Sequence, residues 1–491
     1  MTKRQGVRFA AFALLCVLTL SWLSYFLRER DTLLAGFYSE PENTVDVLLV
    51  GSSHANCTFI PGVLWKEYGI SSHNVYSWDQ TMWISYYYIK EALRTQNPSA
   101  VVLDLYGMMY GNTAETPTYV DDSNYKNAFK LDASLNSLAM TQTVATCGED
   151  RRNPVDFLPL VRYHTRWKFI DENFFLYDAH KQKSYLKGYL PRIATQSCHV
   201  PAPAEGLTPQ EPYPTAVKWL DKIVKLCRNK GLQLVFTMTP YQYTEKEQPI
   251  FAWLAEYAKE NGIPFLNYCD VRGKQIGFDF TTQMYNAGHV NPAGGLVVTR
   301  DLGKFLKASC KLQPPEENPA RDEHDHAAES FYRMMWVVDH APKESAQFVS
   351  WLAQQSKDYT IMITANSKLT GLPDAFKNAC RGLGLTQIEA VFHTPDTSYL
   401  AVLDDGKVYE EAGDELLQKA VACGDWEFEL KSNGGATNAS DIYQNGESKF
   451  PAQNGLRILL YDKIMKMPTI GATYDADTKK FTMIHFEIPQ V

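Results

Sequence analysis

The sequence has no Cys-x-x-Cys pair among its nine cysteines, no internal repeat and no low-complexity segment. Without paired cysteines it lacks the pattern of a zinc ribbon or a thioredoxin-type redox site. It has no excess of basic residues either, because 48 Lys and Arg stand against 56 Asp and Glu, for a net charge of -8. Binding to the phosphate backbone needs a basic face, so nucleic-acid binding is not expected. No metal site or organic cofactor is expected.

Long apolar runs are scarce. The run at residues 9–27 has 19 uncharged, mostly apolar residues. A helix of that length can cross the hydrocarbon core of a bilayer. Three basic residues before it favour a cytoplasmic N-terminus, whereas Arg28 and Arg30 after it weaken the bias. A cleaved signal peptide would have a shorter apolar stretch and a small-x-small site. We expect residues 1–30 to be a cytoplasmic tip and a transmembrane anchor in the cell membrane, with the rest extracytoplasmic.

An extracytoplasmic location permits disulfide bonds. Cys16 lies in the apolar run, and the other eight cysteines are dispersed along the chain. Cys380 and Cys423 would form the local pair in the last domain, but free buried thiols fit the sequence equally well. The sequence leaves both alternatives open.

From residue 44 onward, short apolar segments alternate with amphipathic ones. We expect strands at 45–51, 100–107, 232–240 and 264–270, and helices at 83–96, 213–231 and 249–262. Continuous apolar strands separated by helices indicate an α/β domain with a parallel sheet covered on both faces. We assign this domain to residues 31–325. The irregular, aromatic-rich segment 112–212 is too long for a plain connection, so we expect it to be a cap or insertion over the strand ends.

The segment KLQPPEENPARDEHDH at 311–326 interrupts the periodicity with three prolines and a dense run of charges, and we interpret it as a linker. The pattern that follows is mostly strand-like and predicts a separate α+β domain at 326–491. Its expected strands are at 358–366, 398–411, 425–433, 455–463 and 479–488, and its expected helices are at 373–384 and 413–421.

The segment DVLLVGSSHANCTFIP at 46–61 places two serines directly after an apolar strand and a glycine. The carboxyl edge of a parallel sheet is where α/β proteins bind ligands, so a serine there can act as a nucleophile if a histidine reaches it. Alternatively, Ser52 or Ser53 only caps the following helix. Near the end of the domain, His289 and Asn291 precede a closing amphipathic helix. A serine and a histidine at opposite ends of one α/β unit favour the catalytic interpretation.

These segments resemble the SGNH/GDSL hydrolase superfamily, specifically its membrane-anchored branch beside acyl-carrying membrane proteins in Gram-positive bacteria. That branch is similar to the D-alanyl-lipoteichoic acid and alginate O-acetylation proteins. The blocks that carry the resemblance are the strand with GSS, the aromatic helix QTMWISYYYIKEAL at 80–93, and the block that contains His289 and Asn291. The resemblance spans about residues 44–310 and implies a three-layer, flavodoxin-like parallel sheet.

By position, the resemblance makes Ser53 the nucleophile and His289 the base, with the Ser53 N–H in the oxyanion hole. We expect both side chains at the carboxyl ends of parallel strands, within a few ångströms of each other. His54 either orients a substrate, pairs with the cap or faces solvent at the start of its helix, the commonest place for such a histidine. The expected binding residues are Ser52, His54, Gln80, Trp83 and Asn291.

Two departures from the family's pattern affect this site. The block at 75–83 lacks its usual glycine, and Asn286 stands where the family has an acid three residues before the histidine. That acid holds the imidazole in the productive tautomer, and an amide in its place can cost on the order of 10⁴ in rate. Asp279 could orient His289 instead if its loop folds back. Three alternatives follow for the site: it is active but slow, it is supported by Asp279, or it is inactive and retained for binding alone.

The last domain resembles, more weakly, the interleukin-like EMT inducer domain, which occurs in secreted signalling proteins and as a glycan-binding stem. The segments that carry the resemblance are DYTIMITAN at 358–366, GLGL at 382–385, SYLAVLDDGKVYEE at 398–411 and NGLRILLYD at 454–462. These are strand patterns without catalytic motifs. The resemblance implies a ligand-binding role, with carbohydrate as a candidate ligand, and a structural docking module is the alternative.

Two functions fit these observations. The first is a membrane-anchored O-acyltransferase or esterase that modifies a cell-envelope polysaccharide or teichoic acid-like glycan. It would work through an acyl-Ser53 intermediate supplied by a membrane-bound O-acyltransferase. The second is a catalytically inactive glycan-binding scaffold that recruits such an acyltransferase. Ser53 and His289 favour the first function, and Asn286 favours the second.

Overall fold

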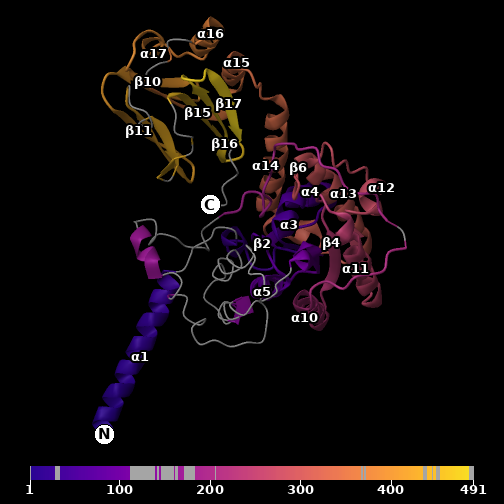
Figure 1. The fold of residues 1–491 in the computed structure, drawn as a ribbon. Helices are drawn as coiled ribbons and strands as arrows, with labels where there is room; N and C mark the ends of the chain where they lie inside the picture. The colour runs from indigo at the N-terminus through magenta and orange to yellow at the C-terminus, as the bar shows by residue number, and fades with distance from the viewer. Residues whose placement is uncertain are drawn as a thin grey trace. The chain divides into compact units, whose positions relative to one another are not determined.

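The computed structural model divides into two compact units, Met1–Ala328 and Glu329–Pro489 (Figure 1). Each unit is described by itself. The description covers residues 2–27, 34–110, 136, 139–140, 143–144, 160, 164–170, 183–204, 206–366, 369, 372–434, 440–444, 446–448, 450 and 454–485. Most of the predicted cap at 112–212 therefore lies outside the described residues.

The first unit is mixed α/β and contains a five-stranded parallel sheet in the order β2-β1-β3-β4-β5. Within β1, Leu48 and Val50 belong to one hydrophobic cluster, whereas Val47 and Leu49 belong to another. This alternation means that both faces of the sheet are buried, as the apolar strands predicted. The strands are β1 (Val47–Gly51), β2 (Ser72–Tyr76), β3 (Ala100–Asp104), β4 (Gln233–Met238) and β5 (Phe265–Asn267).

Helices supply the apolar side chains that cover the two faces. The first cluster takes residues from α5 (Met82–Ala92), α10 (Pro214–Lys230) and α11 (Gln248–Glu260), and the second from α4 (Pro61–Tyr68) and α13 (Pro292–Ser309). The ends of α10 follow from its sequence, because Pro214 occupies the first turn and Gly231, at φ +69°, ends it. Each fully buried large apolar side chain contributes roughly 1.5–3 kcal/mol, so these faces hold the sheet in place.

The N-terminal helix α1 (Lys3–Phe26) begins with a capping box between Thr2 and Gln5. The most apolar window of its segment Lys3–Ser24 has a mean hydropathy of 1.9, and that window is not buried by other described parts of the molecule. The helix is long and apolar enough to cross a membrane, and a signal sequence would have the same properties. The short helix α2 (Ala35–Tyr38) follows.

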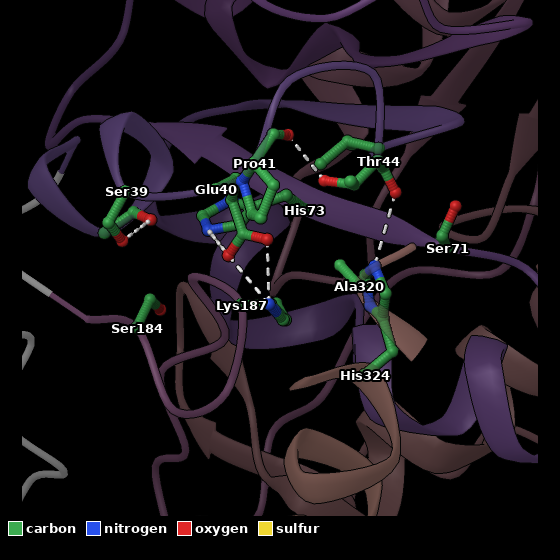
Figure 2. Close-up of polar contacts among 12 residues, drawn as sticks. Ser39, Glu40, Pro41, Thr44, Ser71, His73, Ser184, Lys187, Ala320 and His324 are labelled. Atoms are coloured by element: carbon green, nitrogen blue, oxygen red, sulfur yellow. Dashed lines mark hydrogen bonds and ion pairs between the residues drawn. The ribbon is translucent and has the colours of Figure 1, made fainter. Parts of the chain in front are cut away.

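Four buried titratable side chains meet near the amino ends of β1 and β2, and we call them the amino-end cluster: Glu40, His73, Lys187 and His324. Lys187 Nζ lies 2.8 Å from each carboxylate oxygen of Glu40 (Figure 2). His73 Nε2 lies 3.8 Å from the same carboxylate, and His324 Nε2 is 3.3 Å from the Thr44 carbonyl oxygen. The cluster joins the segment after α2, strand β2, the chain at 187 and helix α14 (Arg321–His340).

The second unit is an α+β arrangement with two antiparallel sheets, in the orders β10-β9-β8-β15-β16-β17 and β11-β12-β13-β14. Helices α15 (Ser345–Gln355), α16 (Asp374–Gly382) and α17 (Glu389–His393) accompany them. The strands of the first sheet are β8 (Tyr359–Ala365), β9 (Ser398–Asp404), β10 (Lys407–Gly413), β15 (Gly455–Asp462), β16 (Met467–Asp475) and β17 (Lys480–His485). Those of the second are β11 (Leu417–Cys423), β12 (Trp426–Ser432), β13 (Asp441–Gln444) and β14 (Glu447–Ser448).

Two predictions about local structure are wrong or incomplete, and the structure decides one alternative that the sequence left open. The segment predicted as a helix at 413–421 instead forms most of β11, which pairs along its whole length with β12. The predicted linker at 311–326 runs into α14, which begins at Arg321 and continues past the division between the units. Cys380 and Cys423 carry free thiols and form no disulfide with each other.

Candidate active site

The position of Ser53 follows from the abrupt end of β1. Gly51 ends the strand, and a Cβ atom there would lie 2.8 Å from the Cβ atoms of both Ala55 and Asp104. Only glycine allows β1, β3 and helix α3 (Ser53–Thr58) to approach so closely. Ser52 caps α3, so Ser53 begins the helix at the carboxyl end of β1, as predicted.

Ser53 and His289 meet although 236 positions separate them in the sequence. Ser53 Oγ lies 2.8 Å from His289 Nε2, and His289 Nδ1 lies 2.9 Å from Asn286 Oδ1. This is the connectivity of a serine, a base and a group that orients the base. The expected proximity is therefore present, but His289 does not follow a strand of the main sheet. It lies on a separate antiparallel ribbon of β6 (Met284–Asn286) and β7 (His289–Val290).

The main chain holds the amide of Asn286 in place. Its Oδ1 also accepts hydrogen bonds from the N–H groups of Gly288 and His289, each at 2.9 Å. Because these donors fix Oδ1 as the acceptor, the proton of His289 belongs on Nδ1, and Nε2 presents a lone pair to the Ser53 hydroxyl. Asn286 thus supplies the orienting part of the usual acid's role without its negative charge.

The pKa of His289 is lowered to about 4, first by burial and then by the positive charge of Arg192. The Arg192 guanidinium itself lies over the rings of Trp78 and Tyr285, at 5.8 and 5.7 Å from their centroids. At neutral pH the imidazole is therefore uncharged and able to accept a proton. A base with so low a pKa removes a proton with little driving force, which predicts slow chemistry.

Asp104 is a buried carboxylic acid group at the carboxyl end of β3 that the sequence analysis did not select. It accepts hydrogen bonds from the N–H groups of Tyr106, at 3.1 Å, and Thr239, at 2.9 Å. Burial raises its pKa to about 6 against the opposing effect of these bonds. Asp104 thereby ties β3 to β4 and caps the 3-10 helix Leu105–Met109 that carries Tyr106. The sequence signal that could have identified Asp104 is a charged residue directly after the apolar run AVVL.

His54 does not face solvent, so that interpretation is wrong. His54 is 4% exposed. Its ring stacks on that of Tyr106, with centroids 3.4 Å apart, and meets the ring of Tyr241 edge to face. The ring centroid of His289 is 5.1 Å away. His54 is therefore an inner wall of the candidate active site.

The other expected binding residues serve the fold. The Ser52 hydroxyl accepts a long hydrogen bond from the His54 N–H, at 3.4 Å. Gln80 is buried and bridges Ser77 and Ser85, and Trp83 is buried in the core. Asn291 caps α13 through Gly294 N–H and donates to the Thr282 carbonyl oxygen. The amide or indole groups of these residues are thus used within the fold or enclosed in its core.

Asp279 does not support His289. In the described part of the chain, its carboxylate accepts hydrogen bonds from the N–H and hydroxyl of Thr281 and from the Thr282 hydroxyl. These bonds lower the pKa of Asp279, which lies at the surface of its own turn. The expectation that Asp279 orients the imidazole is therefore wrong, and the Asn286 amide performs that task.

The missing glycine in the block at 75–83 has a local substitute. Asp79 adopts φ +50°, a left-handed conformation that glycine takes freely and that Asp and Asn tolerate better than other residues. Its carboxylate accepts a hydrogen bond from the Tyr110 hydroxyl at 3.3 Å. The turn after β2 thus forms without glycine.

The described residues hold no metal cluster, and a surface pocket lies away from Ser53 and His289. In the part of the chain that the structure describes, the His, Cys, Asp and Glu side chains include no group of three or more arranged to hold a metal ion. A surface pocket of about 490 Å³ near the end of β5 is lined by Tyr243, Phe251 and Asp270, among others, and by none of Ser53, His289 or Asn286. Comparisons with protein-family models, with curated proteins and with solved structures each find no significant match.

Proposed function

We propose that the chain is a serine O-acyltransferase or esterase of the SGNH/GDSL type, with the three-layer arrangement of that superfamily. The observation that carries the proposal is the hydrogen-bonded relay Ser53 Oγ, His289, Asn286, with both distances below 3 Å. The relay lies at the end of a parallel strand, where α/β proteins bind ligands. The acceptor would be a cell-envelope polysaccharide or a teichoic acid-like glycan.

In the first half-reaction Ser53 Oγ attacks the carbonyl carbon of the acyl donor while its proton passes to His289 Nε2. The carbonyl oxygen becomes negatively charged in the tetrahedral intermediate. The Ser53 N–H, in the first turn of α3, has no acceptor within the helix and can donate to this oxygen. Collapse of the intermediate breaks the bond to the donor's oxygen, which takes the proton from His289 and leaves acyl-Ser53.

In the second half-reaction a glycan hydroxyl attacks acyl-Ser53 and gives its proton to His289. The acyl group passes to the glycan oxygen, and the proton returns to Ser53 Oγ. If water attacks instead, the same steps release a free acid, and the protein is an esterase. Two substrates that visit one serine in turn fit a partnership with a membrane-bound O-acyltransferase as the acyl donor.

We place this site outside the cytoplasm, on a chain held by α1 as a single-pass anchor with a cytoplasmic N-terminus. The support is the length and hydropathy of the helix, together with the basic residues that precede it. A protease-accessibility assay on intact cells carrying a C-terminal tag tests the topology. Loss of the tag without lysis is expected, and protection of the tag would contradict this orientation.

The serine is tested on the full-length protein in detergent with a fluorophosphonate probe and with 4-nitrophenyl acetate. Labelling at Ser53 and ester turnover above background are expected for the wild type, with both lost in Ser53→Ala. Ser52→Ala is the matched control, because it removes the neighbouring hydroxyl, with its long capping bond to His54 N–H and its bond to Tyr110, and leaves Ser53 in place. Equal turnover by the wild type and Ser53→Ala would overturn the enzyme proposal.

The second candidate is a catalytically inactive glycan-binding scaffold that partners a membrane-bound O-acyltransferase. Its support is Asn286 in place of an acid, together with the low pKa of His289. The second unit, which resembles the interleukin-like EMT inducer domain, would then bind carbohydrate. Sedimentation with purified cell-envelope polysaccharide by both the wild type and Ser53→Ala, without ester turnover by either, is the outcome expected for a scaffold.

A further inference from the structure

His54 occupies the candidate active site with a polar atom that the fold does not use. Its Nδ1 is fully buried and has no hydrogen-bond partner among the described residues. The ring makes aromatic contacts alone, stacked on Tyr106 at 3.4 Å and edge-on to Tyr241 at 5.6 Å. His54 is 4% exposed, and a buried ring nitrogen without a partner is uncommon in folded proteins.

A packing role does not account for an imidazole at this position. A phenyl ring could make the same contacts with Tyr106 and Tyr241 without burying unsatisfied polar atoms. Each unsatisfied buried polar group costs about 1–3 kcal/mol. The buried Nδ1 of His54 therefore reduces the stability of the protein, and a purely structural ring at this position would not need it.

The position of the ring indicates which ligand atom it would meet. His54 directly follows Ser53, and its ring centroid is 5.1 Å from that of His289. A Cβ atom at Gly288 would lie 3.7 Å from His54 Nε2, so this nitrogen faces the turn that carries His289. His54 Nε2 thus lies beside the turn that brings His289 to Ser53.

The charge state of the ring limits what it can do. Burial, and then the nearby His289, lower the pKa of His54 well below its ordinary value. A neutral imidazole has one N–H to donate. The role of base is already filled by His289, whose Nε2 contacts Ser53 Oγ and which Asn286 orients. Donation of a hydrogen bond is therefore the chemistry open to His54.

We propose that His54 is a second catalytic histidine, whose neutral ring donates its Nε2 hydrogen to the acyl carbonyl oxygen as Ser53 attacks. This inference rests on the proposed function. When the bond from Ser53 Oγ to the acyl carbon forms, the carbonyl electron pair moves onto the oxygen, the Ser53 proton moves to His289, and His54 keeps its proton while it stabilises the anion. A neutral histidine that polarises a carbonyl group has precedent in enzyme chemistry.

The test compares three substitutions in the full-length protein, with 4-nitrophenyl acetate as substrate. His54→Phe keeps the stacked ring and removes both nitrogens. His54→Gln places an amide nitrogen near the position of Nε2, whereas His54→Asn places one near Nδ1. Loss of an oxyanion donor costs on the order of 10² to 10³ in kcat with little change in KM. We expect that loss for His54→Phe and His54→Asn, and recovery of most of it for His54→Gln.

The outcomes separate this inference from the function on which it rests. If the wild type turns over ester no faster than Ser53→Ala, the proposed function fails. If the wild type is active and His54→Phe matches it, the role of His54 alone is overturned. Equal losses in His54→Gln and His54→Asn would also overturn it, because packing would then explain both. If His54→Phe fails to fold, the contrast between His54→Gln and His54→Asn still decides whether His54 donates from Nε2. His54→Gln should also keep the acidic limb of the wild-type kcat/KM profile.

Discussion

The two ends of the parallel sheet each bring two histidines together, but the partners of these histidines differ. At the amino end, Lys187 and Glu40 neutralise each other at 2.8 Å, beside His73 and His324. At the carboxyl end, His289 joins Ser53 and Asn286, and Nδ1 of the neighbouring His54 has no hydrogen-bond partner in the described residues.

This comparison shows that a perturbed pKa alone does not identify a site. Burial is the largest cause of the lowered pKa at His73 and His324, just as at His289, and the values are about 3, 4 and 4. What differs is the partner. The amino-end histidines lie among a carboxylate, a carbonyl oxygen and an ammonium group, whereas His289 faces a hydroxyl group that can become a nucleophile.

The largest expected contrast is between His289→Ala and His73→Ala. Loss of His289 removes the base, so ester turnover should fall by about 10⁴-fold or more while the unfolding midpoint changes little. Loss of His73 leaves a cavity beside Phe37, so the free energy of unfolding should fall by about 2–4 kcal/mol while the folded fraction keeps its turnover. Turnover and thermal unfolding of both variants check this. A large loss of turnover in folded His73→Ala would contradict the division between the two ends.

Lys187→Met tests the amino-end cluster by leaving the Glu40 carboxylate buried without its partner. Breaking a buried ion pair from one side costs about 3–5 kcal/mol. We expect a loss of that size in chemical unfolding followed by tryptophan fluorescence. The double variant Glu40→Leu with Lys187→Met removes both charges and should recover most of it. No recovery in the double variant would show that the pair itself, rather than the unpaired carboxylate, contributes the stability.

Asn286→Asp should make the carboxyl end a stronger catalyst. A carboxylate in place of Oδ1 can keep the three hydrogen bonds from Gly288 and His289 and adds the charge that stabilises the imidazolium. Turnover should rise by about tenfold or more, and the acidic limb of kcat/KM should move to higher pH because the pKa of His289 rises. Asp279→Asn is the matched control, and it should leave turnover unchanged because, among the described residues, the Asp279 carboxylate bonds only to Thr281 and Thr282. A fall in turnover for Asp279→Asn would contradict the assignment of Asn286.

The smallest expected effect is the change of turnover between pH 7 and pH 5. His289 must be neutral to act as the base, and with a pKa of about 4 it stays neutral throughout that range. The acidic limb should therefore lie near pH 4, well below the ordinary value of a histidine. A limb near 6.5 would contradict the burial of His289.

Stability should respond in that same range of pH. The folded-state pKa values of His73 and His324 are below the ordinary value of 6.5, so the unfolded chain takes up protons first as the pH falls. The free energy of unfolding should decrease between about pH 6.5 and 4. His73→Ala should show a shallower decrease than the wild type.

Much of the first unit could be predicted from its sequence because its elements have strong local patterns. The run VDVLLVG, the amphipathic helix beginning at Pro214 and the strand before Thr239 all lie within a few residues of their predicted bounds. Strand β2 (Ser72–Tyr76) was missed because SHNVY is polar. Its polar side chains are buried, and tertiary hydrogen bonds such as that of the Asn74 amide to the Phe59 carbonyl oxygen make this possible. No local sequence pattern predicts such a bond.

The second unit shows the opposite failure, where a local pattern was clear but wrong. Residues 413–421 have the spacing of an amphipathic helix, yet Leu417–Cys423 forms a strand because β12 offers a complete antiparallel partner. Tertiary pairing overrides weak helix propensity. For the site, the same limit applies to Arg192, whose charge acts on His289, and to Tyr241, which contacts the His54 ring, because both come from segments without a motif.

The sequence by itself determined the strand that ends at Gly51, the serine after it, the histidine ahead of α13 and the length of the apolar N-terminal helix. These depend on residue type and spacing along the chain, which are local. Only the tertiary structure decided that Asn286 rather than Asp279 orients His289, that His54 is buried against Tyr106, and that Glu40 pairs with Lys187. Each of these three features depends on which side chains folding brings together and which it leaves without a partner. Such contacts join residues far apart in the sequence, so local sequence patterns do not predict them.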